Sequence, residues 1–379
     1  MAAARPTRIV PLAGGGQESL LSEVGSQYLL PLFSTRDACA LRLVCREFLA
    51  AVSEQPWEDS KTVIKGSLAA WRASFPRARA ANVSQAGWLV TSRARATPVV
   101  DADLVHLQGL RVLVMRGCEG VTDAAFVHLR GIHTLDMSWC VQVTDAAFAH
   151  LVGAHTLHMS YCNQDEITDA AFAHLRGIHT LNMSCCDQAG ITDAAFAHLR
   201  GIRTLDMSYC NQAGITDAAF AHLRGIRTLN MRCCSQAGIT DSAFEHLRGI
   251  HSLDMSQCSQ AGITDAAFAH LRGTHTLNMS HCSQAGITDA AFAHLRGVHT
   301  LGMGYLGQAG VTDAAFVHLR GVHALDMTNY GLTPNRPHFT GAALVHLQGA
   351  CAVKISPEHA GLRAAASSLG LRVGVCHCA

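Results

Sequence analysis

The chain has 379 residues, of which 49% are hydrophobic and 15% are charged. A chain of this length and composition buries a large core, in more than one domain or in one elongated array, and this excludes a disordered protein. The formal net charge of +1 argues against a nucleic-acid-binding protein built on a strong basic field.

The N-terminal segment, residues 1–18, is rich in Ala, Pro and Gly, and we expect it to be disordered. It lacks the long apolar stretch of a signal peptide, and nothing in the sequence approaches the length of a membrane span. We therefore expect an intracellular protein, cytoplasmic or nuclear. In those reducing compartments the fifteen cysteines stay free.

Residues 19–58 have the pattern of three short amphipathic helices. Ser34 precedes Asp37 by three residues, a spacing that caps the second helix and gives it an acidic first turn. A module this small buries too little surface to be robust alone. We expect a partner helix to complete it by lying in its apolar groove.

The module resembles the F-box, whose pattern is roughly L-P-x-E-[IV], a helix, an Asp, L-x-x-V-C-[RK]-x-[FW] and a late Trp. Residues 41–48, with the sequence LRLVCREF, are the most specific part of the match. Leu21 stands where the family usually has Pro. The resemblance implies a Skp-type adaptor, and through it a cullin, as partners. The residues that it assigns to adaptor binding are Leu20, Leu21, Val24, Leu29, Leu32, Leu41, Leu43, Val44, Phe48 and Trp57. The alternative is a helical cap for the segment that follows.

Residues 59–97 are predicted to be a connector and N-terminal cap, and residues 98–350 an array of repeats. One leucine recurs in steps of 22, 22 and then 24 residues, within the range of leucine-rich repeats, roughly 20–29. Its copies are Leu113, Leu135, Leu157, Leu181, Leu205, Leu229, Leu253, Leu277, Leu301 and Leu325. We expect a closing cap over residues 351–379.

Each repeat predicts one strand and one helix. Residues 134–138 alternate, so that Leu135 points to the core and Asp136 away from it. Cys140 follows at the turn, where a small buried thiol donates weakly to a loop carbonyl. Thr144 or Asp145 caps the helix, and a glycine ends it in the left-handed conformation. Because strands pack about 4.8 Å apart and helices roughly 8–10 Å apart, about ten strands form the inner wall of a horseshoe.

Two columns of the inner wall vary between copies. The residue before the repeat cysteine is aromatic in four of nine copies, and exposed Trp and Tyr are typical interface anchors. The alternative is that it packs on its neighbours. Aspartates in the second column never occupy adjacent strands, which avoids like charges across the ladder and leaves a mildly acidic wall. From these columns, and from Arg232, which interrupts the acidic wall, we predict substrate contacts at Asp136, Trp139, Tyr161, Asp206, Tyr209, Arg232, Asp254, Gln257, His281, Tyr305 and Asn329.

Histidines form two further columns, one before the helix leucine and one before the strand. Rows of imidazole can bind metal or sense pH. Arginine replaces histidine at Arg203 and Arg227, however, and no closed tetrahedral set is visible. We favour duplicated surface residues and predict no metal, no cofactor and no catalytic residue. Acid is still expected to loosen the array by charging a whole row.

An F-box followed by cysteine-type repeats is similar to the F-box/leucine-rich-repeat family. The resemblance implies a small all-α module followed by an α/β repeat solenoid with inner parallel strands and outer helices. It also implies a non-catalytic substrate receptor of a cullin–RING (SCF-type) ubiquitin ligase, with a protein substrate on the concave face. The alternative from the residues is an interaction scaffold or decoy without ligase association.

Overall fold

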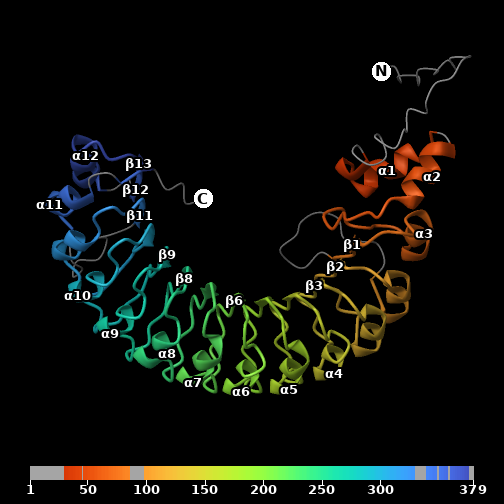
Figure 1. The fold of residues 1–379 in the computed structure, drawn as a ribbon, viewed down its shortest axis with the longest axis horizontal. Helices are drawn as coiled ribbons and strands as arrows, with labels where there is room; N and C mark the ends of the chain where they lie inside the picture. The colour runs from red at the N-terminus through yellow and green to blue at the C-terminus, as the bar shows by residue number, and fades with distance from the viewer. Residues whose placement is uncertain are drawn as a thin grey trace, which may run out of the picture.

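The computed structural model describes residues 30–44, 46–85, 98–328, 339–347, 350–356 and 359–374. The chain winds into a solenoid that curves like a horseshoe, with strands on the inner wall and helices on the outer wall (Figure 1). A small group of helices stands at the N-terminal end of the array. The predicted α/β solenoid is therefore confirmed.

The inner wall is one parallel sheet of 13 strands in the order of the sequence. The register pairs each repeat leucine with the next, as Leu205 pairs with Leu229. The sheet is longer than the ten strands expected, because β1 lies within residues 59–97 and β12 and β13 lie within residues 351–379. The strands are β1 (Ala80–Asn82), β2 (Val112–Val114), β3 (Thr134–Asp136), β4 (Thr156–His158), β5 (Thr180–Asn182), β6 (Thr204–Asp206), β7 (Thr228–Asn230), β8 (Ser252–Asp254), β9 (Thr276–Asn278), β10 (Thr300–Gly302), β11 (Ala324–Met327), β12 (Ala352–Ile355) and β13 (Val373–Gly374).

The outer wall consists of one or two short helical turns per repeat. The α-helices of the array and its C-terminal end are α4 (Asp145–Phe148), α5 (Asp169–Phe172), α6 (Asp193–Phe196), α7 (Asp217–Phe220), α8 (Asp241–Glu245), α9 (Asp265–Phe268), α10 (Asp289–Phe292), α11 (Gly341–Leu344) and α12 (Ala360–Ser368). The 3-10 turns are η3 (Asp101–Leu107), η4 (Asp123–Leu129), η5 (Ala173–Leu175), η6 (Ala221–Leu223), η7 (Asp313–His318) and η8 (Val345–Leu347). Helices this short are stabilised by packing rather than by helix propensity.

The core of a repeat is built from its strand and its helix. Leu205 of β6 and Met207, directly after that strand, are fully buried, as is Phe220 of α7. Burial of such a side chain contributes about 1.5–3 kcal/mol. No repeat buries these residues alone, so the core continues from one repeat to the next and the array is stable only as a stack.

Two sets of hydrogen bonds join neighbouring repeats. The Cys210 thiol donates to the carbonyl of Met183 at 3.1 Å, which confirms the predicted role of the repeat cysteine. Thr216 caps α7 by accepting from the backbone N–H of Ala218. Asp217 instead accepts from the backbone N–H of Thr240 at 2.7 Å and from its hydroxyl at 2.6 Å. The threonine is therefore the cap, and the aspartate holds the cap of the next repeat.

The thiols of the repeat cysteines are buried and unreactive. Burial raises the pKa of Cys162, Cys234 and Cys282 to about 12. A thiolate is the reactive form of cysteine, so these thiols are poor nucleophiles at neutral pH. The repeat cysteines are accordingly structural residues.

The N-terminal helices form a module that shares its core with the first strand of the array. They are η2 (Leu30–Leu32), α1 (Thr35–Leu41), α2 (Arg46–Glu54) and α3 (Leu68–Ser74). Ser34 and Asp37 form the predicted capping box of α1. Asp59 accepts from Thr35 and from the backbone of Thr62. Partial burial opposes its ionisation, but these hydrogen bonds outweigh that effect and lower the pKa of Asp59 to about 2.

Candidate protein-interaction surfaces

The residue before each repeat cysteine lies at the end of its strand, and we call these residues the exit row. All eight described members have a positive φ, between 54° and 65°. This left-handed region costs a residue with a Cβ about 1 kcal/mol or more. The exit row comprises Trp139, Tyr161, Cys185, Tyr209, Cys233, Gln257, His281 and Tyr305. Asn329, the ninth member predicted from the sequence, lies outside the described residues.

The exit-row side chains pack on one another along the rim of the concave face. Trp139 stacks on Tyr161 with ring centroids 3.9 Å apart, and His281 stacks on Tyr305 at 4.0 Å. The side chain of Tyr161 hydrogen-bonds to Cys185, which raises the pKa of the phenol. The row is nevertheless accessible, because Tyr161 is 39% exposed. Both interpretations of the sequence therefore describe part of the arrangement: the side chains pack together and still present their outer surfaces.

In the second variable column, two asparagines pair with the aspartate of the preceding strand. The Asn230 amide donates to the Asp206 carboxylate at 3.1 Å, and the Asn278 amide donates to Asp254 at 3.0 Å. Arg116 pairs with Asp136 at the N-terminal end of the column. Asp136 is only 3% exposed, so this predicted contact residue lies inside the wall rather than on its surface.

Arg232 is placed where it reaches the exit row. Its guanidinium carbon lies 5.9 Å from the ring centroid of Tyr209, which is itself 44% exposed. Its Nε donates to the Gln257 side chain at 3.4 Å. The structure therefore brings Tyr209 and Gln257 of the exit row together with Arg232, which stands at the serine position of its repeat, as a polar and aromatic patch.

The residue just before each strand forms a second row, on the opposite edge of the sheet, which we call the entry row. Its histidines stack in two runs, with ring centroids 4.1–4.7 Å apart. Its members are Arg111, His133, His155, His179, Arg203, Arg227, His251, His275, His299 and His323. Within the described parts of the chain, no group of three or more His, Cys, Asp or Glu could hold a metal ion.

The N-terminal module leaves several of the predicted adaptor residues in solvent. Leu32 is 80% exposed, Leu43 is 81% exposed and Val44 is 59% exposed. Leu41 and Phe48 are half-buried. The predicted contacts at Leu20, Leu21, Val24 and Leu29 lie outside the described residues.

Trp57 is placed differently from the expectation for a partner-binding residue. It is 2% exposed, its Nε1 donates to the carbonyl of Val52 at 2.8 Å, and it packs edge-on against Phe75 with centroids 5.8 Å apart. A late apolar residue after a helix is equally typical of an internal core. Trp57 therefore joins the module to the first strand, where the backbone N–H of Ala80 donates to its carbonyl, and its role in adaptor binding stays a prediction.

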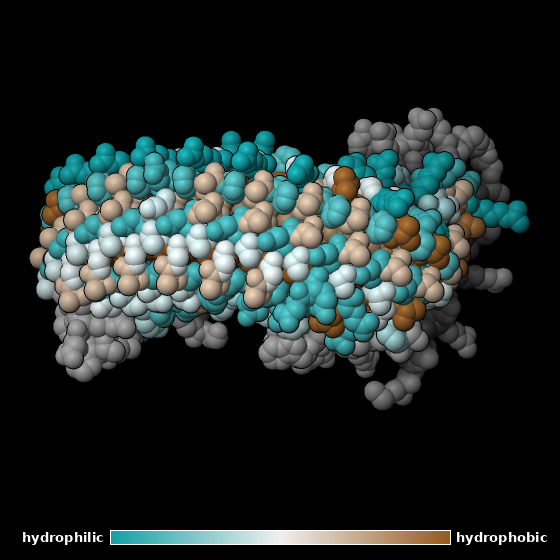
Figure 2. Space-filling model, turned by 90° about the horizontal axis from the view of Figure 1, so that it is seen from below, coloured by the Kyte–Doolittle hydropathy of each residue, from teal (hydrophilic) through white to brown (hydrophobic). Residues whose placement is uncertain are grey.

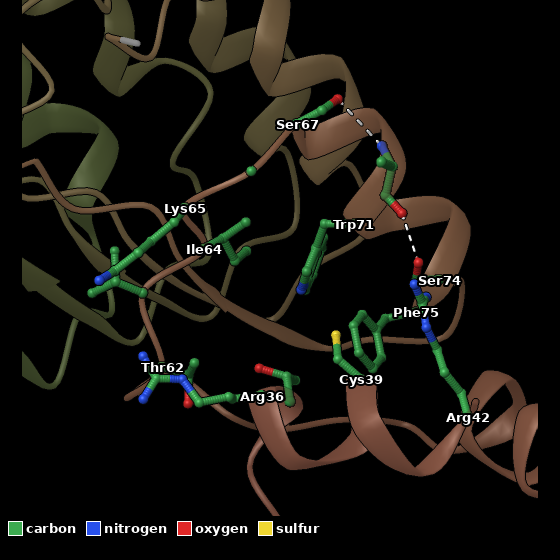
Figure 3. Close-up of a pocket in the computed structure, with 14 residues that line it drawn as sticks. Arg36, Cys39, Arg42, Thr62, Ile64, Lys65, Ser67, Trp71, Ser74 and Phe75 are labelled. Atoms are coloured by element: carbon green, nitrogen blue, oxygen red, sulfur yellow. Dashed lines mark hydrogen bonds between the residues drawn. The ribbon is translucent and has the colours of Figure 1, made fainter. Parts of the chain in front are cut away.

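A pocket of about 340 Å³ lies between α1 and α3. In Figure 3 the indole of Trp71 stands between Ile64 and Phe75, while Arg36 and Cys39 line the side contributed by α1. The pocket lies within the N-terminal module, where α1, α3 and the segment 62–67 leave space between them. No helix among the described residues has the length and apolar character needed to cross a membrane.

No family model and no curated protein matches the chain. Among solved structures, the chain is similar to TLR13 in its complex with ssRNA13, with a TM-score of 0.56, 18% identity, and coverage of 76% of this chain and 42% of that one. It is also similar to the internalin InlF of Listeria monocytogenes, with a TM-score of 0.52, 16% identity, and coverage of 68% and 70%. This chain thus spans less than half of the TLR13 chain. Identities this low bear on the fold alone, and that fold is the leucine-rich-repeat solenoid.

Proposed function

We propose that the protein is a non-catalytic substrate receptor of a cullin–RING ubiquitin ligase. In this proposal the N-terminal module docks on a Skp-type adaptor, and the concave wall holds a protein for ubiquitin transfer by other subunits. The observation that carries the proposal is the solvent exposure of Leu32, Leu43 and Val44 on a small module. Large apolar side chains left in water on a helical module are typical of a partner-binding surface.

The exit row supports the second half of the proposal. Its aromatic side chains are anchored by their neighbours and by a fixed backbone, so little side-chain entropy remains to be lost on binding. Tyr209 with Arg232 beside it, and the stacked Trp139 and Tyr161, combine the residue types enriched in binding hot spots. A protein partner with a neutral to basic surface would suit the aspartates of the wall.

The experiment is a pull-down of the purified full chain against the recombinant Skp adaptor. A Leu43→Glu/Val44→Glu variant is expected to lose adaptor binding without loss of folding, because both side chains are already in solvent. The control is Val127→Glu/Val317→Glu, which changes two valines of the array that are 42% and 45% exposed and is expected to bind normally. If the folded wild type does not bind the adaptor, the ligase proposal fails, and an interaction scaffold or decoy is the function that the fold supports.

A further inference from the structure

The fold places acidic and basic residues on opposite edges of the solenoid, although their charges nearly cancel in the net charge. At the edge where strands end, aspartates such as Asp193 and Asp217 each accept two hydrogen bonds from the threonine of the next repeat. The entry edge carries arginine and histidine instead, in the entry row and in the loops before it. Figure 2 shows one rim of the solenoid as a continuous hydrophilic row.

The loop arginines on the entry edge contact imidazoles of the next repeat. Arg200 donates to the Nδ1 of His222 at 3.4 Å, and the same contact recurs between Arg224 and His246 at 3.2 Å. Each of these arginines therefore has an imidazole, and no carboxylate, as its neighbour in the next repeat. The described residues contain two side-chain ion pairs, Arg116 with Asp136 and Lys354 with Asp326, and neither is in this row.

The entry row changes character at its centre. His155 stacks on His179 with centroids 4.1 Å apart, and stacking resumes between His251 and His275. Arg203 and Arg227 fill the two positions between these runs. A guanidinium does not continue an imidazole stack with the same shape, and a hollow of about 390 Å³ opens at this point.

The lining of this hollow is cationic and rich in donors. Arg203 and Arg227 line it together with His155, His179 and His251, and the hydroxyl-bearing Thr180, Thr204 and Thr228 complete it. No acidic residue is part of the lining. His179 differs from its neighbours, because its Nδ1 is buried without a partner among the described residues, whereas the Nδ1 of His155 contacts Thr156 at 3.3 Å.

We propose that the hollow around Arg203 and Arg227 binds a phosphate monoester group. Arg203 and Arg227 directly precede the adjacent strands β6 and β7 and line one hollow. A guanidinium carries forked N–H groups that recognise oxyanions, and the flanking imidazoles and hydroxyls supply further donors. The hollow is larger than a phosphoryl group and leaves room for part of the molecule that carries it. The group would come from a phosphorylated side chain of a bound protein or from a small phosphorylated molecule. The proposal does not depend on adaptor binding by the N-terminal module.

The chain itself supplies the variant that tests the site. Arg203→His/Arg227→His makes the entry row continuous with the residue that the same fold carries at seven other positions, so folding is expected to be intact. Calorimetric titration with inorganic sulfate at constant ionic strength is expected to give one site per wild-type chain, weakened at least about tenfold in the variant. Absence of saturable binding by the wild type, or equal binding by the variant, would overturn the proposal.

Two further variants separate a built site from a diffuse basic field. Arg248→Ala/Arg272→Ala removes two loop arginines of the same edge and is expected to leave sulfate affinity within about twofold; an equal loss would mean a diffuse field and would overturn the site. His275→Arg/His299→Arg recreates the break in the second histidine run and is expected to raise the stoichiometry to two. A stoichiometry that stays at one would show that the arginine pair is not sufficient to make the site.

The source of the group is measured in the same way. Free phosphate is then compared with a phosphoserine in a short uncharged peptide: tighter binding of the peptide assigns a protein source, and equal binding assigns a small molecule.

Discussion

The two edges of the sheet carry the same number of repeats but use them differently. At the exit edge the carboxylates are engaged in hydrogen bonds between repeats, and the neighbouring exit row varies in sequence on a constant backbone. At the entry edge the arginines and histidines are nearly constant, and their charges face solvent. The comparison separates positions that the stack needs from positions that it leaves open. It also predicts that substitution of these aspartates destabilises the stack more than substitution of the entry-edge arginines.

The largest expected effect comes from removing the hydrogen bonds between the aspartate of one repeat and the threonine of the next. Asp217→Ala leaves the Thr240 N–H and hydroxyl without their acceptor, and we expect a loss of about 2–3 kcal/mol in the free energy of unfolding. Arg224→Ala, on the entry edge of the next loop, is expected to cost about 0–0.5 kcal/mol. Urea unfolding of both variants measures the difference. Equal costs would mean that the two edges are equivalent in stability.

The entry edge is expected to respond to acid. Burial first, and the neighbouring imidazoles second, lower the pKa of His155 and His299 from the ordinary 6.5. Protons therefore bind the unfolded chain in preference to the folded one. The stability that these neutral imidazoles contribute is complete above their pKa in the unfolded chain, and it is lost as the pH falls through their lower pKa in the folded chain. The groups facing these rings are His133, His179 and Arg203 for His155, and His275 and His323 for His299.

This expectation is tested by the melting temperature, which should be lower at about pH 5.5 than at about pH 7.5. The matched control is His299→Gln, which removes a ring from the longer run of the stack and should reduce the change. A melting temperature that does not move between the two values would show that the row titrates without consequence for the fold.

The smallest expected effects concern the left-handed backbone, which both edges require. The entry loops use glycine, such as Gly225 with a φ of 84°, and a Cβ there would meet nothing within 4 Å. Gly225→Ala is therefore expected to cost about 1 kcal/mol from backbone strain alone. At the exit edge, Gln257→Gly relieves the same strain and is expected to change stability by about 0–1 kcal/mol in the favourable direction. Chemical denaturation that ranks the two substitutions in the opposite order would contradict this account.

Much of the array could be predicted because each position of the repeat recurs in many copies, so its preferred residue type is visible in a single sequence. The alternation around Leu135, the thiol of Cys140 and the glycine at Gly153 follow from local chemistry, and the structure has them as expected. The left-handed exit row could not be predicted, since Trp139 and Tyr161 carry no signal of a positive φ. Gly117, at the same position of the first unit and with a φ of 67°, is the one hint in the sequence.

Other features depend on contacts that the sequence does not display. The burial of Trp57 depends on Phe75, which is the C-cap residue of α3 and lies outside the F-box pattern. The cationic hollow depends on the fold placing Arg203 beside Arg227, 24 residues away in the sequence and adjacent in the sheet. The net charge of +1 does not reveal that acidic residues gather on one edge and basic residues on the other, because a net charge carries no information about position.

The threonine and cysteine bonds between repeats recur with the same partners in successive units, and this has a consequence for how such a chain can change its length. In both sets a repeat donates to the one before it, as Thr240 donates to Asp217 and Cys210 to Met183. Deleting or duplicating one 24-residue unit in the middle therefore leaves these two kinds of junction unchanged. The length of the inner wall changes by one strand spacing, about 4.8 Å. The number of repeats therefore sets the length of the inner wall, and a change in that number needs no new kind of threonine or cysteine contact between repeats.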